Sequence, residues 1–296
     1  MNAIQGPYSQ SRNFAGLNPP LSDYQISKVV ILPVPYDGTS EWHSGSREGP
    51  RAILDASNYL ELYDIELDTE IAQVGIHTLP ELQPSFGSAA VTIEIVRQKV
   101  SQLLDDGKFI VTLGGEHSIT SGAVQAFKNN YPNLSVFHLD AHADLRDEYT
   151  GTKYSHACVM RRIIDICPVI QAGIRSLSTE EGLLIKSGRV KTFFYDEAGI
   201  SDSAREQIIN SLTRDVYISI DVDVFDPSVM NAVGTPEPGG MRWQEMLDLL
   251  RLVCRNRNIV GCDIVELCPP QGTSSCCFTA AKLAYKLIGY ALLTGQ

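Results

Sequence analysis

Short apolar runs alternate with longer amphipathic stretches along most of the chain. The short runs are rich in Val, Ile, Leu and Phe, and their length and composition are typical of buried strands. These predicted strands span residues 28–34, 108–114, 134–140, 169–174, 190–195, 215–221 and 259–267. Strands that are apolar on both faces indicate a sheet that is covered on both sides.

The amphipathic stretches carry apolar residues at the spacing of a helix face. They predict helices over residues 91–107, 241–256 and 278–293, and Gly107 supplies a C-terminal stop for the first. Alternating strands and helices predict the α/β fold class, with a parallel sheet between helices. No Ser-rich linker, low-complexity segment or repeat divides the chain, so we expect one domain.

Composition narrows the class of protein. Of 296 residues, 44% are hydrophobic, which is enough for a large core, and the formal net charge of −11 argues against a nucleic-acid partner. The seven cysteines are odd in number and form no C-x-x-C pair, which favours reduced thiols. Lys282 and Lys286 interrupt the apolar C-terminal segment and the polar N-terminus resembles no signal peptide, so we expect a cytoplasmic protein without a membrane span.

The strand at 134–140 leads directly into the sequence DAHAD. Asp140, His142 and Asp144 occupy alternate positions, which places their side chains on one face of an extended segment. Asp221 and Asp223 repeat this arrangement where the strand at 215–221 ends. Taken alone, either motif also fits an Asp-rich loop that binds nothing.

Four strands direct polar residues to the same edge of the sheet, because the carboxyl ends of parallel strands lie together. Burying several carboxylates there without a counter-charge would cost many kcal/mol or force protonation. Carboxylates with imidazoles suit a divalent ion such as Mn²⁺, and six ligands suit two ions better than one. The candidate ligands are His117, Asp140, His142, Asp144, Asp221 and Asp223.

Two neighbouring residues have alternative interpretations. His138 shares the face of the ligands and could be a seventh, although a hydrogen-bonded supporting role is the favoured reading. Glu116 precedes His117 and is interpreted as a supporting or structural residue.

The motifs LGGEHS, DAHAD and SIDVDVFDP, in this order, resemble the signature segments of the ureohydrolase family, the arginases and agmatinases. The resemblance extends to SGSREGPRAI, YSHA, GTPEPGG and DIVELCPP, and covers nearly the whole chain after about residue 28. We therefore expect an N-terminal extension over residues 1–27 and a ureohydrolase domain over residues 28–296. Two departures from the family pattern, at Asn231 and Cys268, put the fine substrate preference in doubt.

The resemblance implies a three-layer α/β/α domain that hydrolyses guanidino compounds to urea and an amine, with two Mn²⁺ per subunit. One Mn²⁺ would be bound by His117 and Asp144, and the other by His142 and Asp223. Asp140 and Asp221 would bridge the two ions. The resemblance also suggests a homotrimer or homohexamer.

The catalytic roles also come from the resemblance. His156, in YSHA, matches the histidine that relays protons, and Glu266, in VELCPP, matches the glutamate that holds the guanidinium group. Asp144 would additionally orient the attacking hydroxide.

The substrate is inferred from the loop before His156. Its acidic residues Asp147 and Glu148 would tolerate an ammonium group and repel a carboxylate, which favours agmatine over arginine and predicts putrescine and urea as products. The alternative is that these charges, with Arg146, pair on the surface. Activity as an arginase, a guanidinobutyrase or another amidinohydrolase, a metal-dependent deacetylase, and a non-catalytic binding homologue all remain open at this point.

Overall fold

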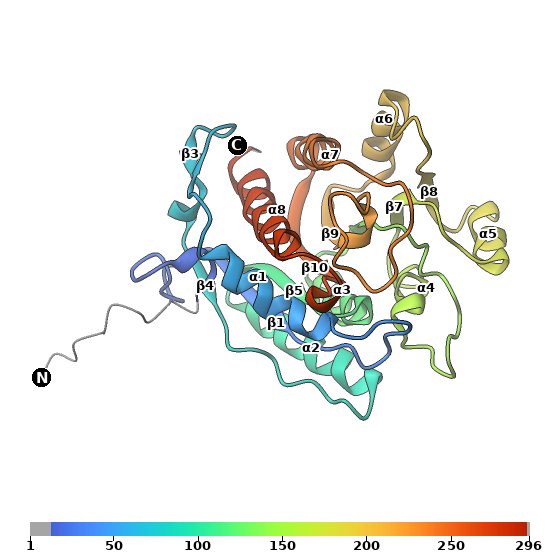
Figure 1. The fold of residues 1–296 in the computed structure, drawn as a ribbon, viewed down its shortest axis with the longest axis horizontal. Helices are drawn as coiled ribbons and strands as arrows, with labels where there is room; N and C mark the ends of the chain where they lie inside the picture. The colour runs from blue at the N-terminus through green and yellow to red at the C-terminus, as the bar shows by residue number, and fades with distance from the viewer. Residues whose placement is uncertain (1–12, 295–296) are drawn as a thin grey trace, which may run out of the picture.

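An eight-stranded parallel sheet runs through the computed structural model, which describes residues 13–294 (Figure 1). The strands lie in the order β4-β1-β5-β10-β9-β6-β7-β8, and every pairing in this sheet is parallel. Their bounds are β1 (Val29–Val34), β4 (Ile76–Thr78), β5 (Phe109–Gly114), β6 (Leu134–Leu139), β7 (Val169–Ile174), β8 (Lys191–Phe194), β9 (Asp215–Asp221) and β10 (Asn258–Val265).

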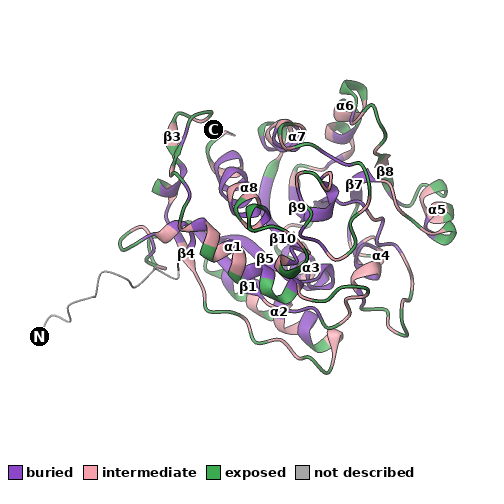
Figure 2. Ribbon diagram, viewed as in Figure 1, coloured by how far each residue is buried: buried purple, intermediate pink, exposed green. Residues whose placement is uncertain are grey.

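Helices cover both faces of this sheet, so the predicted three-layer α/β/α architecture is confirmed. α1, α7 and α8 pack together on one face, and α2, α3 and α4 pack together on the other. Figure 2 shows the central strands as the buried layer, while the helices turn exposed residues outward. The helices are α1 (Gly49–Ser57), α2 (Ala89–Asp105), α3 (Thr120–Asn130), α4 (Val159–Ile163), α5 (Thr179–Lys186), α6 (Asp202–Ser211), α7 (Trp243–Asn256) and α8 (Ser274–Leu293).

The alternation of side chains along each strand builds two separate cores. In β1, Val29 and Ile31 join the core under α1 and α8, whereas Val30 and Leu32 join the core under α2 and α3. All six residues of β1 are buried, as expected for a strand covered on both faces. The apolar runs of the sequence therefore match interior strands of the sheet, except for residues 190–195, which contain the edge strand β8.

Several short elements were not predicted. They include β4, a two-stranded antiparallel sheet made by β2 (Tyr63–Asp64) and β3 (Thr69–Glu70), and the helices α1, α4, α5 and α6. Each is too short to show a clear apolar period in the sequence. Residues 13–27, which the sequence sets apart as part of an extension, place Phe14 in the core; residues 1–12 lie outside the described residues.

α8 corrects one expectation about the C-terminal segment. Within residues 13–294, this helix is long and apolar enough to cross a membrane by length and composition, despite Lys282 and Lys286. However, 61% of that stretch is buried inside the fold, and its apolar side is filled by Leu283, Leu287 and Tyr290. α8 is therefore a core helix in this structure.

The four strands that carry the polar motifs are direct neighbours, in the order β5-β10-β9-β6. Their register aligns the ends from which the motifs start, since Leu139 pairs with Ile220 and Val265 pairs with Asp221. Asp140 is therefore level with Asp221, and Glu266 follows one residue further along the sheet. The predicted meeting of four strand ends is confirmed.

Candidate metal centre and active site

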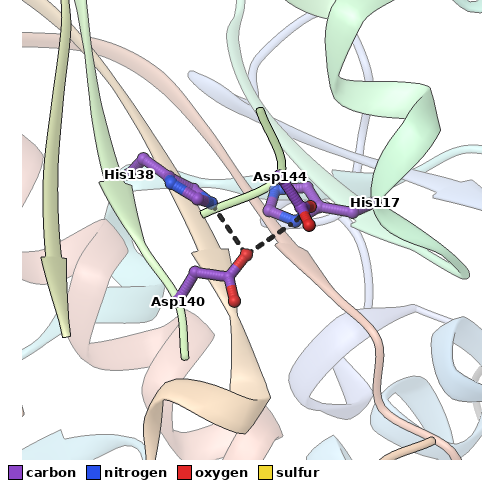
Figure 3. Close-up of side chains that lie close together, drawn as sticks. All are labelled: His117, His138, Asp140 and Asp144. Carbon is purple, nitrogen blue, oxygen red and sulfur yellow. Dashed lines mark hydrogen bonds and ion pairs between the residues drawn. The ribbon is translucent and has the colours of Figure 1, made fainter. Parts of the chain in front are cut away.

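His117 opens a short 3-10 helix, separated from the end of β5 by two residues, and turns Nδ1 toward three carboxylates. Its Nδ1 lies 3.2 Å from Oδ2 of Asp140, 3.2 Å from Oδ2 of Asp144 and 3.4 Å from Oδ2 of Asp221. Figure 3 shows three of these side chains gathered together, with Asp140 between His117 and His138. This arrangement places one imidazole nitrogen at the centre of an anionic group.

The protonated nitrogen of His117 is fixed from the other side of the ring. The hydroxyl of Ser219 donates to Oδ1 of Asp263 at 2.7 Å, so its oxygen accepts from Nε2 of His117 at 2.9 Å. With the proton on Nε2, the neutral ring presents a lone pair at Nδ1. This Nδ1 is buried and has no hydrogen-bond partner within residues 13–294. A cation between it and the carboxylates would satisfy both.

Three of the aspartates share one pattern of support. One oxygen accepts a backbone N–H and the other points into the cluster: Asp140 accepts from His142 N at 2.6 Å, and Asp221 accepts from Asp223 N at 2.9 Å. Asp223 in turn accepts from Ala141 N at 3.0 Å. These backbone donors hold the carboxylates in place before any ligand arrives.

His142 forms a second group on the other side of Asp140. Its Nδ1 lies 2.8 Å from Oδ2 of Asp223 and 3.7 Å from Oδ1 of Asp140. Asp140 thus belongs to two clusters of potential ligands, one with His117 and Asp144 and one with His142 and Asp223. The sharing of Asp140 is compatible with the assignment that the sequence resemblance implies, and the full ligand set stays a prediction.

The electrostatics of these residues fit divalent cations. Burial, followed by the charges of Asp223 and Asp140, raises the pKa of Asp221 well above its ordinary value. Burial alone lowers the pKa of His117, but Asp140, Asp144 and Asp221 raise it well above the ordinary value. In the absence of a metal ion, Asp221 and His117 would therefore bind protons instead. No lysine or arginine pairs with the cluster in the described part of the chain.

His138 supports the site and does not offer a ligand nitrogen. Gln171 donates from Nε2 to the carbonyl of Ala143 at 2.7 Å and to Nδ1 of His138 at 3.0 Å. The proton of His138 is therefore on Nε2, which donates to Oδ2 of Asp140 at 2.8 Å. Both ring nitrogens are used, which agrees with the favoured reading of this residue.

Glu266 follows β10 in a left-handed backbone conformation, with φ of 66°, and Asp144 shares this feature with φ of 53°. Such conformations are strained for residues other than glycine and are concentrated at functional sites. Oε1 of Glu266 accepts from the N–H of His117 at 2.7 Å, which ties the carboxylate to the metal-binding segment. Burial, followed by the charge of Glu116, raises its pKa well above the ordinary value.

His156 is held by a network that begins at the fully buried Glu116. The carboxylate of Glu116 accepts from the backbone N–H and from Oγ1 of Thr39, each at 2.6 Å. Because the hydroxyl proton of Thr39 is used there, its oxygen accepts from the backbone N–H of His156 at 3.1 Å. Nδ1 of His156 lies 3.4 Å from Oγ1 of Thr39 and 3.3 Å from Oγ of Ser155, so these two hydroxyls orient the ring, and among the described residues no such contact occupies Nε2.

A pocket of about 250 Å³ joins these groups and opens at the edge of the sheet. Its lining includes the predicted residues His142, Asp144, His156, Asp221, Asp223 and Glu266. The lining also contains Glu41, Arg146 and Tyr149. This volume suits a small molecule.

The structure does not bring Asp147 and Glu148 to the pocket. Asp147 is ion-paired with Arg162 beside α4, and Glu148 is exposed; neither lines the cavity. Pairing on the surface, the alternative that the sequence left open, therefore describes Asp147 better than substrate binding does. The loop contributes Arg146 and Tyr149 to the pocket instead.

The two departures from the family pattern also lie away from the pocket lining. Asn231 accepts from the backbone N–H of Thr273 at 3.2 Å, and the N–H of Cys268 donates to the carbonyl of Ala232 at 2.7 Å. Cys268 is a buried free thiol. Asn231 joins the loop after β9 to the start of α8, and Cys268 joins the same loop to the segment after β10.

Sequence reasoning missed several residues that position the site. Thr39, Ser219 and Asp263 orient the two histidines, and Arg175 donates to the carbonyls of Asp223 and Glu237 at 2.8 and 3.0 Å. Asp263 had a detectable signal, an acid in the middle of an otherwise apolar strand. Thr39 and Ser219 have no such signal.

Comparison with known proteins agrees with this geometry. Residues 27–290 match the model of the Arginase family. The chain belongs to the arginase family. An N(1)-aminopropylagmatine ureohydrolase of Synechocystis sp. is 38% identical over 279 residues, covering 91% of each chain. An agmatinase of Bacillus anthracis is 36% identical over 250 residues, covering 83% of this chain and 85% of that protein.

A solved structure, titled a putative agmatinase from Clostridium difficile, superimposes with a TM-score of 0.84 at 34% identity. The superposition covers 91% of this chain and 98% of the chain in that structure. The arginase-family chain is therefore a hydrolase of the ureohydrolase type, and both the expected family and the expected fold are confirmed. Its His and Asp cluster fits the binuclear metal dependence of the family.

Proposed function

We propose that this chain is a manganese-dependent hydrolase of guanidinoalkylamines, with agmatine as the simplest substrate and putrescine and urea as products. The observation that carries the proposal is the placement of Glu266 in one pocket with two histidine-aspartate groups that share Asp140. Oxygen-rich sites with imidazoles suit Mn²⁺. Glu266 supplies a carboxylate for the planar guanidinium group.

His117 with Asp144 and His142 with Asp223 would hold the two ions, sharing Asp140 and Asp221. When bound, two such metal ions lower the pKa of a water molecule and generate a nucleophile near neutral pH. Glu266 holds the guanidinium by paired hydrogen bonds and fixes its carbon for attack. His156, with Nδ1 turned to the hydroxyls of Thr39 and Ser155, keeps Nε2 available to move a proton to the departing amine.

A second candidate substrate is N(1)-aminopropylagmatine, which carries the same guanidinium on a longer cationic tail. The name of the Synechocystis relative favours it. The open pocket mouth, with an acidic and aromatic lining of Glu41, Trp42 and Tyr149, also suits an extended cation.

Urea release in the presence of Mn²⁺ tests the proposal. Purified protein is assayed with agmatine, N(1)-aminopropylagmatine, arginine and 4-guanidinobutyrate, with a Glu266→Gln variant as the control. We expect a higher kcat/KM for the two cationic tails and little activity in the variant. A preference for arginine or 4-guanidinobutyrate, or no urea from any compound, would overturn the proposal. The homotrimer or homohexamer stays a prediction, which light scattering after gel filtration tests.

A further inference from the structure

Glu41 lines this pocket and is assigned neither to the metal ions nor to the guanidinium group. Asp144, Asp221 and Asp223 belong to the metal cluster, and Glu266 faces the guanidinium. Glu181 also lines the pocket, but its two oxygens accept backbone N–H groups of Leu145 at 2.9 Å and Ser178 at 2.7 Å. Within the described lining, Glu41 remains as the acidic group that is available to a ligand.

The loop that carries Glu41 is anchored on both sides. Before it, Thr39 is bound to the buried Glu116. After it, the N–H of Gly45 donates to Asp37 at 3.0 Å, and Arg47 pairs with the same carboxylate at 2.5 Å. The loop tip is therefore positioned by the fold, although it reaches solvent at the pocket mouth.

Aromatic side chains stand beside this carboxylate. The hydroxyl of Tyr149 donates to Oε2 of Glu41, and the ring of Tyr149 meets the ring of His156 edge-on at 6.1 Å. Trp42 is 81% exposed at the mouth and has a φ of 57°, an unusual conformation for a bulky residue. A carboxylate that is bonded to Tyr149 and next in sequence to the exposed Trp42 is a suitable environment for an ammonium group.

The spacing connects Glu41 to the reacting end of the pocket. Tyr149 links Glu41 to His156, so one aromatic side chain separates the carboxylate from the relay histidine. Six single bonds separate the guanidinium carbon of agmatine from its ammonium nitrogen, roughly 7.5 Å when extended, or twice the three-bond spacing of consecutive Cα atoms. The tail of a guanidinoalkylamine is therefore long enough to extend from Glu266 toward the mouth.

Resting on the proposed function, we propose that Glu41 binds the ammonium group on the alkyl tail of the substrate and selects cationic over anionic tails. The ammonium gains a charge-assisted hydrogen bond, and Tyr149 holds the carboxylate in position through its hydroxyl. A tail that ends in a carboxylate would instead meet a like charge. Glu41 takes the role that the sequence assigned to Asp147 and Glu148.

The test compares Glu41→Gln with the parent protein on two substrates of equal length. Agmatine carries the ammonium, and N-butylguanidine replaces it with a methyl group. We expect kcat/KM for agmatine to fall about 10- to 100-fold, mainly through KM, because a hydrogen bond to a charged group is lost from both ground and transition state. The value for N-butylguanidine should change less than about 3-fold, since its tail makes no such bond.

Two further variants make the result specific. Glu48→Gln removes an exposed carboxylate from the end of the same loop and should leave both substrates unchanged. Glu41→Lys should raise kcat/KM for 4-guanidinobutyrate relative to agmatine, which a loss of folding cannot produce. Thermal unfolding and bound Mn²⁺ are measured for each variant.

The outcomes separate the two proposals. If Glu41→Gln retains the parent kcat/KM for agmatine, or loses activity equally on both substrates, Glu41 does not bind the tail, and the proposed function stands. If the parent protein loaded with Mn²⁺ releases urea from neither compound, the proposed function itself fails.

Discussion

Two groups of carboxylates in this molecule are neutralised in different ways. The lysine cluster comprises Lys286 and Tyr290 of α8 with Asp64 and Glu66 of the small antiparallel sheet and its turn. Lys286 Nζ lies 3.0 Å from Asp64 and 2.6 Å from Glu66, and Tyr290 donates to Glu66 at 2.5 Å. Burial by itself would raise the pKa of Glu66. The hydrogen bonds from Lys286 and Tyr290 outweigh this effect and lower the pKa to about 2.

The metal cluster comprises Asp140, Asp144, Asp221 and Asp223 with His117 and His142. In the part of the chain that the structure describes, no lysine or arginine pairs with its carboxylates, and burial with like charges raises the pKa of Asp221. The carboxylates of the lysine cluster are neutralised by a lysine of the same chain, and this cluster joins two elements of the fold. Within residues 13–294 the metal cluster has no such partner for its carboxylates, and a cluster of this kind marks a binding site for a ligand.

The largest expected effect comes from Asp140→Asn, because this carboxylate belongs to both cation sites. We expect loss of both bound ions and a fall in urea release of at least about 100-fold, more than the loss typical of a supporting residue. Elemental analysis of dialysed protein gives the metal content. Two ions per chain in this variant would show that Asp140 is not shared.

Lys286→Met tests the opposite cluster. It leaves the Asp64 and Glu66 carboxylates without their lysine, and we expect the free energy of unfolding to fall by about 3 kcal/mol while the metal content stays the same. Lys282→Met, one turn earlier on α8, removes an incompletely buried lysine and should cost less than about 1 kcal/mol. Denaturant titration measures both. A loss of metal in Lys286→Met would mean that the two clusters are coupled.

Ser219→Ala tests whether the orientation of His117 matters for the ions. Without the acceptor at Nε2, we expect metal affinity to fall about 10- to 100-fold with little change in the unfolding midpoint. Thr120→Val is the matched control, because Thr120 donates to the same Asp263 carboxylate at 2.8 Å without contacting His117 Nε2. Equal losses in both variants would place the effect at Asp263 and not at His117.

Acidity distinguishes the two clusters by the sign of its effect. The stabilisation from Glu66 is complete above its ordinary pKa of 4.5 and is lost as the pH falls toward about 2. In the metal-free chain, raised pKa values at Asp221 and His117 mean that folding takes up protons, so stability falls as the pH rises. Mn²⁺ should therefore raise the melting temperature more at about pH 9 than at about pH 6. Scanning calorimetry with and without metal measures this difference, and the reverse trend would contradict the account.

Much of the fold could be predicted because its signals are local. The apolar runs are continuous, the strands are parallel, and the polar residues at their ends need no knowledge of distant contacts to be placed at one edge. The six candidate ligands follow from this rule and from the family resemblance. The structure confirms that the four strands concerned are adjacent.

The remaining features depend on contacts between distant parts of the chain. Thr39 and Glu116 are 77 residues apart, and His117 and Ser219 are 102 residues apart, so neither pairing leaves a local pattern. The acidic loop misled for a related reason. Asp147 pairs with Arg162 on α4, whereas Glu41, in a loop before α1, lines the pocket.

The central claim is that the metal cluster holds its carboxylates together because two divalent ions neutralise them. Equilibrium dialysis of the metal-free protein against MnCl₂ at neutral pH tests it most directly. We predict two Mn²⁺ bound per chain, accompanied by proton release and a higher melting temperature. If the protein binds no Mn²⁺ even at a saturating MnCl₂ concentration, and its melting temperature does not change, the account is contradicted.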